Sequence, residues 1–85
     1  MSKKSFTVRM TKLRDGRTYE QTGTLDELVK SYSYTLECGA SWAHEPGNAK
    51  INQNPKSVKT LIKNLNNAVN NSAANGYAGK SYSLV

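Results

Sequence analysis

The sequence predicts a small α+β domain in which a β-hairpin precedes two helices and a short C-terminal strand can be added (order ββααβ). Three observations favour this class: strand-like alternation near the start, an Asp-Gly turn dipeptide after it, and two later segments with helical apolar spacing. With 85 residues the chain has room for one domain, expected over residues 1–85.

The hairpin is predicted from alternation and turn chemistry. Residues 5–11 alternate between apolar and polar side chains, as in a half-buried strand. The Asp15-Gly16 dipeptide favours a type I′ turn, because glycine tolerates a positive φ, and residues 17–23 then form a second strand. The apolar positions of the first strand are Phe6, Val8 and Met10.

Two amphipathic helices are predicted after the hairpin. The first begins at Thr24, which forms a capping box with Glu27, and ends at Gly39 as an αL stop. The second is expected from an Asn-Pro start at residues 54–55 to an Asn-Gly end at residues 75–76. The apolar stripes contain Leu25, Leu28, Val29, Tyr32 and Leu36, and then Val58, Leu61, Ile62, Leu65 and Val69.

A long loop is expected between the helices, over residues 40–54, where no periodicity is present. Loops of this length tend to be functional or disordered. Trp42, His44 and Ile51 argue against disorder. Residues 82–85 can add a short third strand.

Charge and composition indicate the class of partner. Twelve Lys and Arg residues stand against six Asp and Glu, and residues 46–85 contain five lysines and no acid. This asymmetry favours anionic partners such as nucleic acid, nucleotides or acidic proteins, although solubility alone also explains it.

Composition also predicts what the protein lacks. One Cys and one His cannot supply a four-ligand zinc site, so no metal or other cofactor is expected, and a lone thiol fits a reducing compartment. No apolar segment is long enough for a signal peptide or a membrane span, so we expect a soluble cytoplasmic protein. A core this small, without a disulfide, predicts a homo-oligomer.

The motifs that could support catalysis are weak, and the protein is expected not to be an enzyme. The Gly-Lys-Ser sequence at residues 79–81 lacks the earlier glycine of a P-loop, since position 74 is alanine. Cys38 with His44 could form a nucleophile and base, but a thiol at a helix end is more often structural. His44 with Glu45 could act on a phosphodiester by acid–base chemistry, with less support than binding.

The second predicted helix has a basic, amide-rich face. A projection at 100° per residue places Lys56, Lys59 and Lys63 opposite the apolar stripe, with Asn67 and Asn70. Lysine pairs with phosphate, and asparagine donates to phosphate oxygens and reads base edges. This face predicts contact with a nucleotide or nucleic acid; the alternative is a solvated helix face.

Aromatic residues outside the apolar stripes are a second candidate feature. Tyr34 projects away from the stripe of the first helix, where it can stack on a ligand. Trp42 either fills the core beneath the loop or offers a platform for a purine or a partner protein. Tyr77 and Tyr82 flank Lys80, an alternation that suits base stacking and backbone contact.

The chain resembles small accessory, non-structural proteins of tailed bacteriophages. The residues that support the resemblance are the hairpin, Tyr34-Thr-Leu-Glu-Cys-Gly, Lys50-Ile-Asn-Gln-Asn-Pro-Lys, Leu65-Asn-Asn-Ala and Ala74-Asn-Gly-Tyr. The resemblance implies a protein of the host cell cytoplasm that binds host machinery, nucleic acid or the nucleotide signals of bacterial immunity.

These observations predict a non-enzymatic phage accessory protein that binds an anionic nucleotide-type ligand as a counter-defence sponge, with pockets completed at an oligomer interface. The aromatic side chains would stack, the lysines would neutralise phosphates, and Asn52 would hydrogen-bond the base or ribose. One alternative is a nucleic-acid-binding protein that uses the second helix and Lys80; another is an inhibitor that docks on a host defence protein through Tyr34 and Trp42. The predicted ligand-binding residues are Tyr34, Trp42, His44, Lys50, Asn52, Lys56, Lys59 and Lys63.

Overall fold

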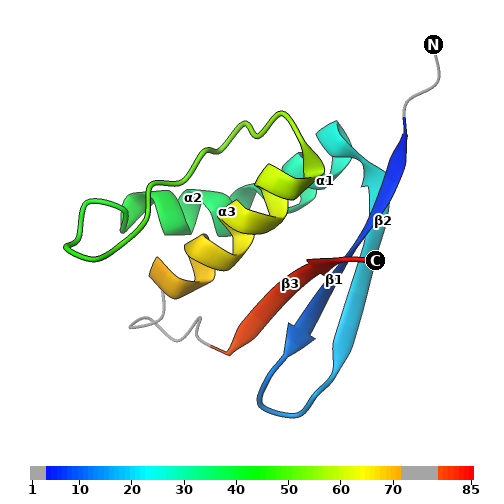
Figure 1. Ribbon diagram of the computed structural model, residues 1–85, viewed down its shortest axis with the longest axis horizontal. Helices are drawn as coiled ribbons and strands as arrows, with labels where there is room; N and C mark the ends of the chain where they lie inside the picture. Colours follow the sequence, from blue (N-terminus) through cyan, green and yellow to red (C-terminus); the bar gives the residue numbers. More distant parts are fainter. Residues whose placement is uncertain (1–3, 72–78) are drawn as a thin grey trace.

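A three-stranded antiparallel sheet and three helices make up the computed structural model, which describes residues 4–71 and 79–85 (Figure 1). The predicted α+β class is therefore confirmed. The described part of the chain has no helix long and apolar enough to cross a membrane. The elements are β1 (Ser5–Lys12), β2 (Thr18–Thr24), α1 (Leu25–Ser31), α2 (Ser33–Ser41), α3 (Val58–Asn71) and β3 (Lys80–Leu84).

The sheet has the order β2-β1-β3, so that the predicted C-terminal strand is present and pairs with β1. Helix α1 packs against β2, α3 against β3, and α2 against α3. Val8 of β1 is fully buried beneath these helices, and Tyr82 of β3 belongs to the same core. The apolar stripes supply the rest of the core cluster: Leu28, Leu36, Leu61, Leu65 and Val69.

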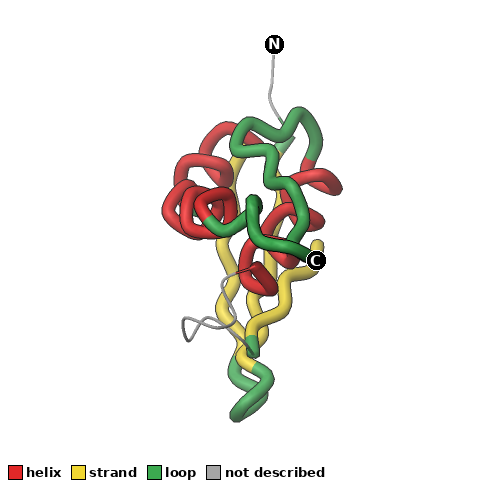
Figure 2. Tube along the Cα trace, turned by 90° about the vertical axis from the view of Figure 1, so that its left-hand side faces the viewer, coloured by secondary structure: helices red, strands yellow, loops and turns green. Residues whose placement is uncertain are grey.

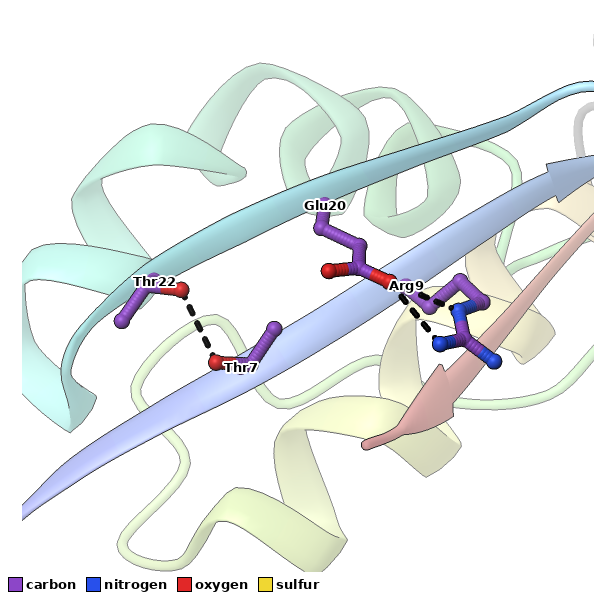
Figure 3. A network of polar contacts seen from close by, with 4 residues as sticks. All are labelled: Thr7, Arg9, Glu20 and Thr22. Carbon is purple, nitrogen blue, oxygen red and sulfur yellow. Dashed lines mark hydrogen bonds and ion pairs between the residues drawn. The ribbon is translucent and has the colours of Figure 1, made fainter.

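The other face of the sheet is polar, as the alternation predicts. Thr7 and Thr22 share a hydrogen bond of 2.8 Å between their hydroxyl oxygens (Figure 3). Arg9 Nη2 lies 2.9 Å from Glu20 Oε2, and its Nε donates to the same oxygen at 3.0 Å. These cross-strand pairs lie at neighbouring registers and stabilise the hairpin without burying an apolar side chain.

The predicted type I′ turn is wrong. Lys12 N–H donates to Arg17 O at 2.8 Å and Gly16 N–H to Lys12 O at 2.8 Å, which closes a four-residue loop. A type I′ turn needs a positive φ at Asp15 as well as Gly16. Among the described residues only glycines have a positive φ, Gly16 at 73°. The Asp15 carboxylate instead accepts the Arg17 backbone N–H at 3.0 Å and fixes the turn.

The first predicted helix is divided in two. The capping box is present, because Thr24 N–H donates to Glu27 Oε1 at 2.9 Å and Glu27 N–H to Thr24 Oγ1 at 3.3 Å. Tyr32 then leaves helical geometry, with φ −100° and ψ 11°, between α1 and α2. Its ring meets Tyr82 edge to face, with centroids 5.6 Å apart. Burial raises the pKa of both phenols; the charge of Tyr82 adds to the rise at Tyr32, and a hydrogen bond from Thr35 partly offsets the rise at Tyr82.

Gly39 is not the predicted helix stop. It is buried inside α2, which continues to Ser41. A Cβ added at Gly39 would overlap the Cβ and Cα of Ala68 in α3. The glycine is therefore needed for the close approach of two helix backbones.

Helix α3 begins later than predicted. Pro55 is buried in the segment before the helix, and the N-terminal side-chain acceptor is Ser57. Its Oγ accepts the Thr60 N–H at 3.2 Å, while its carbonyl accepts the Leu61 N–H at 3.0 Å. The predicted end at residues 75–76 lies outside the described residues.

Three asparagines of α3 bind the backbone of neighbouring segments through paired hydrogen bonds. Asn64 bridges the N–H and C=O of Asn52, at 3.3 and 3.0 Å. Asn66 bridges the N–H and C=O of Tyr82, at 2.8 and 3.0 Å. Asn71 bridges those of Ala49, at 3.0 and 2.8 Å, and also donates to Gly39 O at 3.1 Å. The long loop, residues 42–57, is thus attached to α3, and the outer edge of β3 is covered at Tyr82.

Candidate functional site

The predicted ligand-binding residues are distributed along the loop and α3 and do not meet in one cleft. The Asn71 hydrogen bonds hold Gly39 and Ala49 at the C-terminal end of α3, so Trp42, directly after α2, lies near that end. Lys56 precedes the N-terminal end of α3. The fourteen residues of α3 separate these ends by about 20 Å. Trp42 and Lys56 therefore belong to separate surfaces.

The aromatic members of the predicted set lie on or beside α2. Tyr34 is 66% exposed on α2, and Trp42 is 37% exposed at its C-cap. The Trp42 carbonyl accepts a hydrogen bond from the Asn48 amide at 2.7 Å, so the chain turns sharply there. His44 is exposed, with Nε2 3.3 Å from Glu45 Oε1.

The polar members of the set line the loop and the solvent side of α3. Lys50 is exposed, and the Asn52 side-chain oxygen accepts the Asn54 N–H at 2.9 Å, forming a local turn. Lys59 and Lys63, one helical turn apart, are both exposed on α3. Like charges at this spacing oppose helix formation, and no acidic residue follows position 45 to offset them.

The predicted alternation of aromatic and basic residues at the C-terminus is not a stacking surface. Tyr82 is buried in the core, where its ring contacts Tyr32. Tyr77 lies outside the described residues. Lys80 is half-buried at the start of β3.

Basic and acidic residues are separated along the chain in three segments. Residues 1–17 contain six basic side chains and one acidic, whereas residues 18–45 contain one basic and five acidic. Residues 46–85 contain five basic side chains and no acidic one. Residues 1–45, which hold seven basic and six acidic side chains, thus consist of a basic segment followed by an acidic one. The fold places β1 between β2 and β3, so the basic N-terminal strand adjoins the acid-free C-terminal strand.

Four cations gather at the end of the sheet that holds the hairpin turn; we name Lys12, Arg14, Arg17 and Lys80 the distal basic end. The sheet register places Lys12 directly opposite Lys80. Leu13 N–H donates to Gly79 O at 2.7 Å, which joins the start of β3 to the turn. In both views this end extends beyond the helices (Figures 1 and 2).

Asp15 and Tyr19 are the acidic and the aromatic side chain at the distal basic end. Asp15 is held by its turn: it accepts the Arg17 N–H and lies 3.6 Å from Arg17 Nε. Tyr19 is 48% exposed, with Lys12 Nζ 5.4 Å from its ring centroid, a cation–π distance. An exposed ring among cations can stack on a base while the cations contact phosphates.

Sequence reasoning missed the hairpin cations. Arg14 and Arg17 are not among the predicted ligand-binding residues, because a charge count over residues 1–45 offsets them against acids that the fold places on β2, α1, α2 and the loop after α2. The useful indication was the run of basic residues before position 18, counted separately from the acids that follow.

The described residues contain no cluster of three His, Cys, Asp or Glu side chains that could hold a metal ion. Cys38 is half-buried in α2, and its carbonyl accepts the Ser41 hydroxyl at 2.7 Å. The distal basic end presents four cations, one carboxylate engaged with Arg17 and one aromatic ring, and this chemistry is suited to binding anions.

Comparison with known proteins found no matching family model, no similar curated protein and no similar solved structure. Function is therefore inferred from the geometry of the chain itself.

Proposed function

We propose that the protein binds nucleic acid without catalysis, through the distal basic end. The observation that supports this is the register of β1 with β3, which adds Lys80 to the cations of the hairpin. The single acidic side chain of the turn, Asp15, is engaged with Arg17. A protruding surface with this charge attracts a polyanion and releases its counterions.

The shape of this end favours a polymer over a small ligand. Lys12, Arg14 and Lys80 extend over a hairpin and the adjoining strand, and none of them lines the clefts beside α1. A two-stranded ribbon fits the major groove of duplex DNA. The exposed Tyr19 ring suits the unstacked bases of a single strand. Duplex and single-stranded partners would make the same phosphate contacts, and only a single strand would stack on Tyr19.

Binding is tested with two variants of equal charge change. Lys12→Gln/Arg14→Gln removes two cations from the distal basic end, and Lys59→Gln/Lys63→Gln removes two from the exposed side of α3. Fluorescence anisotropy would measure the affinity for labelled single-stranded RNA, single-stranded DNA and duplex DNA over a range of salt concentrations. We expect the first variant to lose roughly tenfold or more in affinity. The slope of the logarithm of the binding constant against the logarithm of salt concentration should fall in magnitude by about 2.

The α3 variant is the control for overall charge, and we expect a much smaller loss. Equal losses in the two variants would contradict a localised site, and a salt-independent affinity of the unmodified protein would contradict phosphate contacts. If Tyr19→Leu weakens binding to single strands only, the partner is single-stranded; if it weakens none, groove binding is supported.

The other sequence-based expectations stay predictions. Docking on a host defence protein rests on Tyr34 and Trp42, which are exposed at opposite ends of α2. In a phage-encoded protein, nucleic-acid binding could itself counter a defence system that uses nucleic acid. A homo-oligomer and a cytoplasmic location are likewise predictions.

A further inference from the structure

An open cleft of about 760 Å³ lies between α1 and the segment that precedes α3. Its apolar lining comes from Leu25 and Val29 of α1 and from Pro55. Pro55 is buried, and the two α1 side chains are half-buried, so the apolar surface has a fixed position. The volume falls within the range of sites for small organic ligands.

The wall opposite α1 is fixed by three separate contacts. Asn64 holds the backbone of Asn52 through two hydrogen bonds, and Asn54 N–H donates to the Asn52 side chain. Ser57 anchors the other end at the start of α3. The segment 53–56 is therefore held at both ends, and Gln53 and Asn54 line the cleft from it. No hydrogen bond uses either side-chain amide within the described parts of the chain.

Two cations line this cleft, Lys30 from α1 and Lys56 from the segment before α3. Both are exposed, and neither has an ion pair with any described residue. Asp26 also lines the cleft; although it lies four positions before Lys30 on α1, no ion pair joins the two. The cleft thus combines two lysines, two side-chain amides and the Asp26 carboxylate with an apolar lining.

We infer that this cleft binds a small anionic ligand of the nucleoside monophosphate type. The apolar floor takes the base, and Lys30 and Lys56 take the phosphate. Gln53 and Asn54 supply donors and acceptors for the base edge. Inorganic phosphate would use the lysines but leave the apolar floor exposed, and a nucleoside would leave two cations unneutralised. Only a ligand with both parts uses the whole lining.

This cleft is distinct from the distal basic end. α1 begins where β2 ends, at Thr24, whereas the hairpin turn precedes Thr18 at the other end of the same strand. The length of β2 separates the two surfaces by about 20 Å. Loss of one site should therefore leave the other intact.

The test is calorimetric titration of the protein with AMP, GMP, CMP and UMP. Adenosine and inorganic phosphate are titrated separately, because each represents one part of such a ligand. Lys30→Gln/Lys56→Gln removes the cations of the cleft, and Lys59→Gln/Lys63→Gln is the control of equal charge. We expect at least one monophosphate to bind more tightly than either half. The cleft variant should lose at least roughly tenfold in affinity, and the control should keep it.

The inference is overturned if no monophosphate binds at millimolar concentration, or if the cleft variant and the control bind equally. It is also overturned if inorganic phosphate alone binds as tightly as every monophosphate. Circular dichroism verifies that both variants are folded. Oligonucleotide affinity of the cleft variant separates the two proposals, because it should stay unchanged even where monophosphate binding is lost.

Discussion

Replacing Asn71 by alanine is expected to destabilise the fold by roughly 2–4 kcal/mol, because it leaves several backbone groups without a partner. The Asn71 amide donates to Gly39 O and Ala49 O, and its oxygen accepts the Ala49 N–H. The side chain is buried, so water replaces these bonds poorly. Small domains have a total stability of only about 5–10 kcal/mol, so this loss is a large part of it.

Asn70→Ala is the matched control, since the same residue type stands one position earlier on an exposed site of α3. We expect it to change the free energy of unfolding by less than about 0.5 kcal/mol. Urea denaturation followed by circular dichroism measures both. Equal stabilities of the Asn71 and Asn70 variants would show that the loop is not held by Asn71.

Gly39→Ala is expected to destabilise the protein by roughly 1–3 kcal/mol, against the direction of helix propensity. Within a helix, alanine in place of glycine is favourable by about 0.5–1 kcal/mol. Here the added methyl group would overlap Ala68, and the α3 backbone carbon is part of the contact. The two helices must separate, which weakens the packing of Leu36 and Leu65 in the core.

Ala68→Gly removes the Cβ from the overlap and leaves the Ala68 Cα, so it relieves the clash in part. The double variant should be more stable than the sum of the two single changes predicts, because one of the two overlapping atoms of residue 68 is gone. Thermal and urea unfolding give the required free energies. A stabilised Gly39→Ala protein would contradict the close approach of α2 and α3.

The strands and the helical segments could be predicted from the sequence because they depend on local periodicity. The role of Gly39 could not, because a glycine after an apolar stripe fits a helix stop and a helix crossing equally well. Only the position of Ala68, far along the chain, decides between them. Likewise, Asn54-Pro55 and Ser57 are both good helix starts. In the structure α3 begins at Val58, after Ser57, and Pro55 is buried outside the helix.

The candidate sites could be predicted in chemistry but not in position. Lys56 was identified as a ligand residue, and it lines the cleft, but its partner Lys30 requires the packing of α1 beside the segment 53–56. Lys12 and Lys80 meet only because β3 pairs with β1. Such contacts depend on tertiary structure, which local patterns do not encode.

The roles of the asparagines in α3 also depend on tertiary contacts. The sequence predicts Asn67 and Asn70 as amides for ligand contact, whereas Asn64, Asn66 and Asn71 of the same helix bind the protein's own backbone. Asparagine lowers helix propensity, and here that cost is offset by paired hydrogen bonds to the loop and to β3. Composition therefore identified an unusual helix, while the hydrogen bonds explain much of its amide content.

Chemical-shift mapping by NMR tests the central claim most directly. Isotopically labelled protein would be titrated with an unlabelled oligonucleotide at low salt, with single-stranded and duplex forms tested separately. Shifted backbone amides should gather at residues 12–19 and at Gly79 and Lys80, and they should return toward their free positions as salt is added. Shifts confined to α1 and residues 53–56, or no shift with any oligonucleotide, would contradict nucleic-acid binding through the distal basic end.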